Sequence, residues 1–122
     1  MIDWNQVKTA EHKRAERLSP ERIAARRYQA ETGGFEFSGI RIETDDRAKL
    51  MINGAAVEAM IDPGYVLNWK TQSGFVTLNG DQVIAIARAV RAHVQACFDR
   101  EAELLALGSD ITDEDLESGW PA

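Results

Sequence analysis

The sequence is poor in the residues that most often build disulfides and metal sites. It has one cysteine, Cys97, and two histidines, His12 and His93, among 122 residues. A single cysteine excludes a disulfide within the chain and is typical of a reducing compartment. Neither histidine has cysteine or carboxylate neighbours at a spacing typical of a zinc or iron site. We therefore expect no metal and no other cofactor.

Long hydrophobic runs are also missing. No segment approaches the ~20 consecutive apolar residues that span a bilayer, so we expect no membrane insertion. The first residues, MIDWNQVKTAEHKRAE, lack the apolar segment of a secretory signal, and export by that route is not expected. A content of 44% hydrophobic and 28% charged residues is ordinary for a globular protein, and 122 residues suffice for one domain.

Positive charge is scarce outside the N-terminal quarter. The chain has 14 Lys and Arg against 20 Asp and Glu, a net charge of -6. Residues 1–31 carry seven basic and five acidic side chains, and the remainder carries seven basic and fifteen acidic ones. Binding to nucleic acid depends on neutralising phosphates, so an acidic body argues against a nucleic-acid partner.

Motifs that mark common enzymes are absent. The sequence contains no GxSxG nucleophile elbow, no GxGxxG and no GxxxxGK[ST] phosphate loop. The carboxylates Asp99, Glu101 and Glu103 fall at offsets that do not place all three on one face of a helix. We therefore predict a protein without enzymatic activity.

What the chain does have is one long helix, predicted over residues 81–107. This stretch contains neither Gly nor Pro and is rich in Ala and Leu, so it predicts a single helix of roughly 40 Å. Apolar residues recur along it with spacings of four and three, which is a heptad seam that Glu101 interrupts. The seam residues are Val83, Ala87, Val90, Val94, Cys97 and Leu104. A thiol on such a seam is expected to be buried and structural rather than a nucleophile.

The rest of the chain predicts an α+β fold. Residues 1–30 are interpreted as a charged helical arm, in which Ser19 and Pro20 start a helix that runs to about Glu31. Residues 31–122 are interpreted as a single α+β domain. Its elements are a hairpin over 35–43, a helix over roughly 46–61, a hairpin over 65–78, the long helix and a last turn of helix after Thr112.

Two details of this domain are predicted more specifically. The apolar stripe of the 46–61 helix is expected to face the core, and it consists of Ala48, Met51, Ile52, Ala55, Ala59 and Met60. The two hairpins could join in one small antiparallel sheet. The C-terminal segment carries Trp120, and we expect this side chain to fold back and dock.

Three segments of the domain resemble a known family. They are Trp69-Lys70-Thr71, the helix containing Phe98-Asp99-Arg100-Glu101, and Gly119-Trp120-Pro121. Over about residues 30–122 the chain resembles a small bacteriophage and prophage domain of unknown function. That domain occurs at the C-terminal ends of tail-fibre-type proteins and as short stand-alone tail proteins. The resemblance implies a role in the virion or in tail assembly, and it brings no catalytic residues.

Together these observations predict a non-enzymatic bacteriophage tail protein. It is expected to be made in the cytoplasm of the host bacterium and to act in the tail of the virion. We expect a dimer or trimer that contacts other tail, fibre or baseplate proteins. The alternative is a chaperone of tail-fibre assembly that does not stay in the virion. The predicted contacts are the six residues of the seam together with Trp4 and Trp120.

Overall fold

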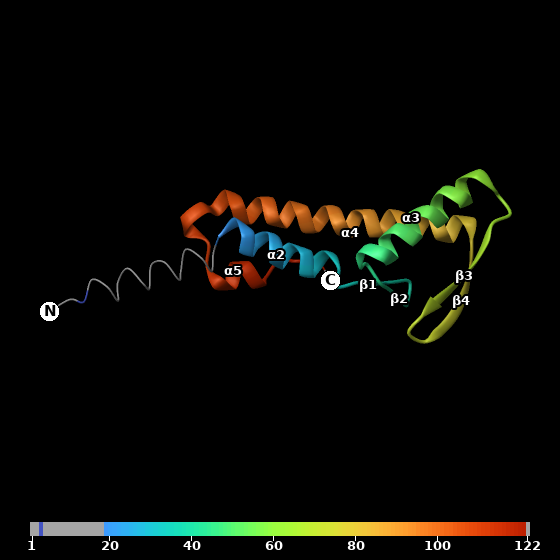
Figure 1. The fold of residues 1–122 in the computed structure, drawn as a ribbon, viewed down its shortest axis with the longest axis horizontal. Coiled ribbons are helices and arrows are strands. Elements are labelled where there is room, and N and C mark those ends of the chain that lie inside the picture. The colour runs from blue at the N-terminus through green and yellow to red at the C-terminus, as the bar shows by residue number, and fades with distance from the viewer. Residues whose placement is uncertain (1–2, 4–18, 122) are drawn as a thin grey trace.

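The computed structural model describes residue 3 and residues 19–121, which form an α+β fold arranged along one long helix (Figure 1). The predicted fold class is confirmed. The elements in chain order are α2 (Pro20–Glu31), β1 (Phe35–Phe37), β2 (Ile40–Ile42), α3 (Asp46–Ile61), β3 (Val66–Thr71), β4 (Gly74–Asn79), α4 (Gly80–Leu107), a 3-10 turn (Gly108–Asp110) and α5 (Asp113–Glu117).

The long helix α4 has the predicted extent, with one additional residue at its N-terminal end. Asn79 and Gln82 form a capping box, in which the Asn79 side chain accepts from the backbone N–H of Gln82 and the Gln82 side chain accepts from that of Asn79. Gly108 ends the helix with a φ of 58°, a left-handed conformation that favours glycine.

Each hairpin forms its own two-stranded antiparallel sheet. In the first, Phe35 pairs with Ile42 across a Ser38-Gly39 turn in which both residues have positive φ, as a type I′ turn requires. In the second, Val66 pairs with Asn79. Within the described residues, the possible joining of the two hairpins into one sheet is not observed.

The apolar core has two parts at different positions along α4. The larger part lies between α3, both hairpins and the N-terminal half of α4, and it contains Ile42, Ile52, Leu78, Val83 and Val90. The smaller part joins α2, the C-terminal end of α4 and the segment after it. It contains Ile23, Leu104, Ile111 and Leu116, with Trp120 packed against them.

Helix α2 belongs to this core rather than to a separate arm. Its Ile23 is buried, and the helix packs along the C-terminal half of α4 (Figure 1). Ser19 caps it as predicted, accepting from the backbone N–H of Arg22. The boundary predicted at residue 30 therefore does not separate α2 from the domain. The remainder of the predicted arm, apart from Asp3, lies outside the described residues.

The apolar stripe predicted for the 46–61 helix is partly wrong. Ile52 and Ala59 are buried as expected, and Ala48 and Ala55 are half-buried. Met51 and Met60 are exposed instead, while Ala56 takes a core position. The buried side of α3 is centred on Ile52, Ala56 and Ala59, and at 3.6 residues per turn Met51 and Met60 fall on its two flanks, outside the core.

The C-terminal segment docks as predicted. Trp120 is half-buried in the smaller core, its indole N–H donates to the Leu116 carbonyl at 2.8 Å, and Arg26 stacks over its ring. Arg100 donates to the backbone carbonyls of Asp115 and Ser118, both at 3.0 Å. This segment therefore closes the end of α4.

Candidate interaction surface

The predicted α4 seam is for the most part covered by the chain itself. Val83, Val90, Cys97 and Leu104 are all at most 6% exposed. These side chains pack against α3, the hairpins and α2, so a second copy could reach them only if the fold opened. Self-association through these four residues is therefore not what this arrangement favours.

The other predicted contact residues differ in position. Ala87 and Val94 are half-buried and line an open groove of about 350 Å³ between α3 and α4, together with Lys49 and Arg91. Trp120 packs in the smaller core. Trp4 lies outside the described residues. The predicted contact residues that the structure describes therefore do not share one open surface.

A Cys-His pair lies beneath the surface but lacks the geometry of a catalytic pair. The Cys97 sulfur is 4.0 Å from Nε2 of His93, and this nitrogen is also 3.0 Å from the Ala30 carbonyl oxygen. The His93 ring stacks on Phe35. Cys97 is completely buried, and burial raises the pKa of its thiol, with Glu31 adding to the effect. A neutral, inaccessible thiol suits packing rather than nucleophilic attack.

A network of charges holds α2, α3 and α4 together, and the sequence analysis missed it. Glu31 is 6% exposed and forms ion pairs with Arg27 and Lys49. Arg27 also donates to Glu101 at 3.0 Å and lies over the ring of Phe98. Burial acts to raise the pKa of Glu31, but its hydrogen bonds and charge interactions with Lys49 and Arg27 outweigh burial and lower it.

The same junction satisfies the polar groups of the turn after α2. The Thr44 hydroxyl donates to the Glu31 carbonyl at 2.6 Å and accepts from the Gly34 N–H at 2.9 Å. Across the described part of the chain, no buried side-chain nitrogen or oxygen lacks a hydrogen-bond partner. The network is complete within itself and therefore fits a structural role.

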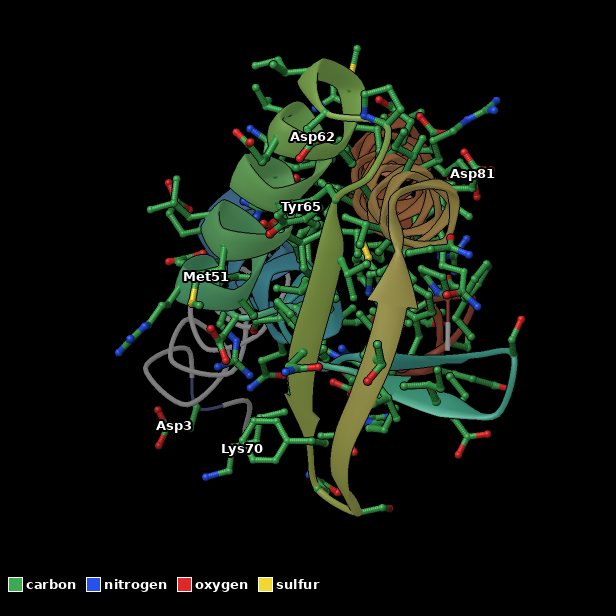
Figure 2. The ribbon with its side chains drawn as sticks, turned by 90° about the vertical axis from the view of Figure 1, so that its right-hand side faces the viewer. Asp3, Met51, Asp62, Tyr65, Lys70 and Asp81 are labelled. Atoms are coloured by element: carbon green, nitrogen blue, oxygen red, sulfur yellow. The ribbon has the colours of Figure 1, made fainter. Side chains whose placement is uncertain are left out.

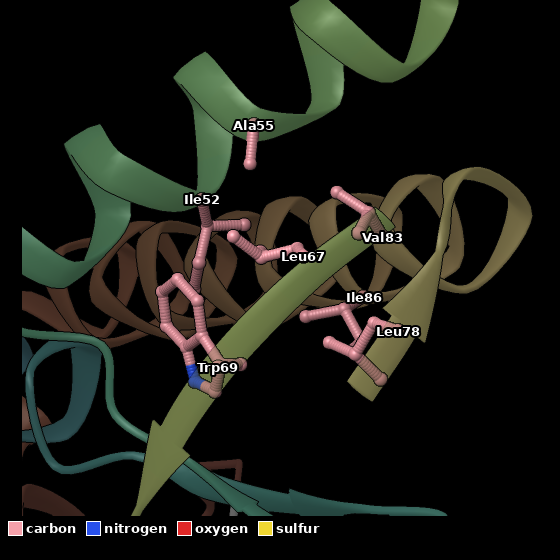
Figure 3. Close-up of a pocket in the computed structure, with 7 residues that line it drawn as sticks. All are labelled: Ile52, Ala55, Leu67, Trp69, Leu78, Val83 and Ile86. Atoms are coloured by element: carbon pink, nitrogen blue, oxygen red, sulfur yellow. The ribbon is translucent and has the colours of Figure 1, made fainter. Parts of the chain in front are cut away.

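The apolar cavity beneath the second hairpin is too small for a ligand (Figure 3). Ile52, Leu67, Trp69 and Ile86 are among the side chains that point into it. Its volume is about 10 Å³, roughly that of one water molecule, and its lining is apolar. In residues 3 and 19–121, no group of three or more His, Cys, Asp or Glu could hold a metal ion.

An open apolar surface lies on α3, and we call it the outer face of α3. It consists of Leu50, Val57 and Ile61, flanked by Met51 and Met60. Leu50 and Ile61 are both 72% exposed and Met60 is 74% exposed. Figure 2 shows Met51 projecting from α3 on the side away from α4. The spacing of Leu50, Gly54, Val57 and Ile61 marks a second apolar side of α3 in the sequence, and only the tertiary structure shows that this side is the open one.

A second open surface lies between the N-terminal end of α3 and the second hairpin. It is a groove of about 400 Å³ with Met51, Trp69 and Phe75 in its lining and with both basic and acidic side chains around them. Phe75 is strongly exposed. Aromatic and methionine side chains of this kind are enriched at protein interfaces.

The sequence matches a family described as a domain of unknown function, DUF4376, over residues 11–118. The chain belongs to this family. The DUF4376 match covers nearly the whole chain and includes α2, whereas the resemblance noted from motifs began near residue 30. It confirms the resemblance to a domain of unknown function, and the link to phage tails remains a prediction.

No curated protein and no solved structure matches this DUF4376 chain. Among the helices described, none is both long enough and apolar enough to cross a membrane.

Proposed function

We propose that this DUF4376 protein is a non-enzymatic structural protein of bacteriophage tails that works through protein–protein contacts. It would be made in the cytoplasm of the host bacterium and built into the virion as several copies, next to fibre or baseplate proteins. The observation that carries the proposal is the outer face of α3. Soluble monomers seldom expose five large apolar side chains on one short helix, and such patches mark interaction sites.

The second groove supports a contact with a different protein. An apolar face on α3 and an aromatic groove at the second hairpin give the domain two open surfaces, which adjoin at Met51. One surface can serve contacts between copies, and the other can serve a tail partner. The placement in a phage tail rests on the resemblance of the Trp69–Thr71, Phe98–Glu101 and Gly119–Pro121 segments to small phage tail domains.

Purified particles provide the test. Phage induced from a host that carries this gene would be banded by density, and their proteins quantified by mass spectrometry. The proposal predicts the chain in the particles at a constant ratio to the tail proteins. Its presence in the lysate but not in the particles would contradict a structural role and would favour the alternative, an assembly chaperone that leaves before the virion is complete.

A further inference from the structure

We infer that the outer face of α3 is the contact between two copies of this chain, which meet with their α3 helices antiparallel about a two-fold axis. The inference deepens the proposed function, on which it rests, by naming the surface through which copies associate. In this arrangement Leu50 packs against the second copy's Ile61, and Gly54 packs against the second copy's Val57.

The first argument is the spacing of the apolar residues. Leu50, Gly54, Val57 and Ile61 follow one another at intervals of four, three and four residues, which is the seam of a two-helix contact. This seam lies opposite Ile52, Ala56 and Ala59, which pack into the core. Residues 50–61 contain one charged side chain, Glu58, so the face has little of the polar character of a solvated helix surface.

The second argument is shape. A Cβ added to Gly54 would have no atom within 4 Å, so the glycine leaves an open notch in the middle of the seam. An antiparallel pair places the second copy's Val57 in this notch and sets the two large residues Leu50 and Ile61 against each other. A parallel pair would place glycine against glycine and leave a void, which costs contacts on both sides.

The third argument is charge. Arg47 lies at the N-terminal end of the seam, and Asp62 lies at its C-terminal end, beyond the last helical residue. An antiparallel pair brings Arg47 of each copy to the C-terminal end of the other α3, where Asp62 and the helix dipole are negative. A parallel pair would bring the two arginines together. Asp45 and Asp46 at the same end are engaged within their own copy, by the Ala48 N–H and by Tyr28 and Lys49 respectively. The charge left to pair between copies is that of Arg47, so the antiparallel, self-complementary contact is the favoured one.

The small area of the outer face of α3 predicts a weak association between copies. A helix of 16 residues is about 24 Å long and about 10 Å wide, so one face covers on the order of 250 Å² per copy. A standard interface covers about 800 Å² per partner. We therefore expect a weak, concentration-dependent dimer, suited to an assembly in which many copies are held together.

Disulfide trapping tests the arrangement directly. Leu50→Cys and Ile61→Cys chains, one of them tagged, would be mixed and oxidised gently. The wild-type chain gives the background, because its one thiol, Cys97, is fully buried. Phe75→Cys, which places an exposed thiol on the second hairpin, is the matched control for random collisions.

The antiparallel contact predicts a disulfide in the mixture of Leu50→Cys and Ile61→Cys and little in either variant alone. Positions 50 and 50 of two antiparallel copies lie about 16 Å apart along the helix axis, beyond the reach of a disulfide. Efficient trapping of Leu50→Cys with itself would overturn the antiparallel arrangement. Trapping in the mixture no greater than for Phe75→Cys would overturn the inference altogether.

Sedimentation equilibrium gives an independent measurement. Val57→Asp should raise the dissociation constant at least tenfold while the circular dichroism spectrum stays unchanged. Val66→Asp, at an exposed valine on β3, should leave the constant unchanged. An equal effect of both variants, or a wild-type chain that stays monomeric throughout the micromolar range, would refute the contact. Neither result bears on whether the protein is found in virions, so the two proposals can fail separately.

Discussion

Two apolar surfaces of similar spacing have different positions in this fold. The α4 seam, with Val83, Val90 and Leu104, is buried by α3, the hairpins and α2. The outer face of α3, with Leu50 and Ile61, has the same alternation of three and four residues and lies open. A heptad pattern thus shows that a helix face needs a partner, and the tertiary fold decides whether the chain itself provides it.

The difference has an energetic meaning. A residue of the α4 seam contributes to folding, since its contacts form whenever the chain folds. The large residues of the outer face of α3 are 50–74% exposed and make fewer contacts within the chain, so their substitution should change association more than folding. The following predictions test this division, from the largest expected effect to the smallest.

Val83→Asp should have the largest effect. It would bury a charge among apolar side chains at a site that is 2% exposed, and it should cost at least about 4 kcal/mol of stability. Val57→Asp introduces the same charge on the exposed face and should cost about 1 kcal/mol or less. Urea unfolding followed by circular dichroism compares them. Similar losses in both variants would show that the two faces do not differ as described.

The extent of the elements could be predicted from local chemistry. Asn79 and Gly108 mark the ends of α4, and Ser38-Gly39 marks the first hairpin turn, because caps and tight turns depend on residues that are neighbours in the sequence. The open face of α3 was missed for the opposite reason. Helix α3 is apolar on two sides, and periodicity alone does not tell which side the rest of the chain covers.

The charge network could not be predicted either. Lys49 and Glu101 lie far in the sequence from their partners in α2. Lys49 meets Glu31, and Glu101 meets Arg27, only when α2, α3 and α4 pack together. Arg27 pairs with both Glu31 and Glu101. No local pattern distinguishes such a residue from its exposed neighbours, so the network appears only in the tertiary structure.

Leu104→Ala should have the next largest effect. Leu104 is completely buried in the smaller core, and its truncation should cost about 2–5 kcal/mol. The neighbouring Leu105 is nearly half exposed, so Leu105→Ala should cost about 1 kcal/mol or less. Thermal unfolding of the two variants gives the measurement. A loss at Leu105 as large as that at Leu104 would mean that the second residue also has a partner.

Glu31→Gln should have an intermediate effect that depends on pH. The substitution removes the negative charge that pairs with both Arg27 and Lys49 and should cost about 1–3 kcal/mol at pH 7. The pKa of Glu31 is lowered in the folded protein, so its contribution is present above its ordinary value near 4.5 and is lost as the pH falls through the folded pKa. The wild-type and Glu31→Gln stabilities should therefore converge in acid.

A matched substitution at an exposed ion pair serves as the control for Glu31→Gln. Glu117 pairs with Arg26 at 3.0 Å but is 64% exposed, so Glu117→Gln should cost less than about 1 kcal/mol and should not alter the acid dependence. Urea unfolding between pH 3 and pH 7 measures both variants. If the difference in the free energy of unfolding between the wild type and Glu31→Gln stays constant across this range, the charge of Glu31 is not what holds the three helices together.

Gly54→Ala should have the smallest effect on folding. It should stabilise the monomer, whereas substitutions in the α4 seam destabilise it. The new methyl group meets no atom within 4 Å, and alanine favours a helix over glycine, so the monomer should gain about 1 kcal/mol. The same methyl group fills the notch for the second copy's Val57, so association should weaken. Gly39→Ala also enters open space, but its φ of 79° should make it destabilising. Urea unfolding at low protein concentration measures the stability of the monomer, and sedimentation equilibrium measures the dissociation constant. Together they show whether Gly54 contributes to the fold or to the contact between copies.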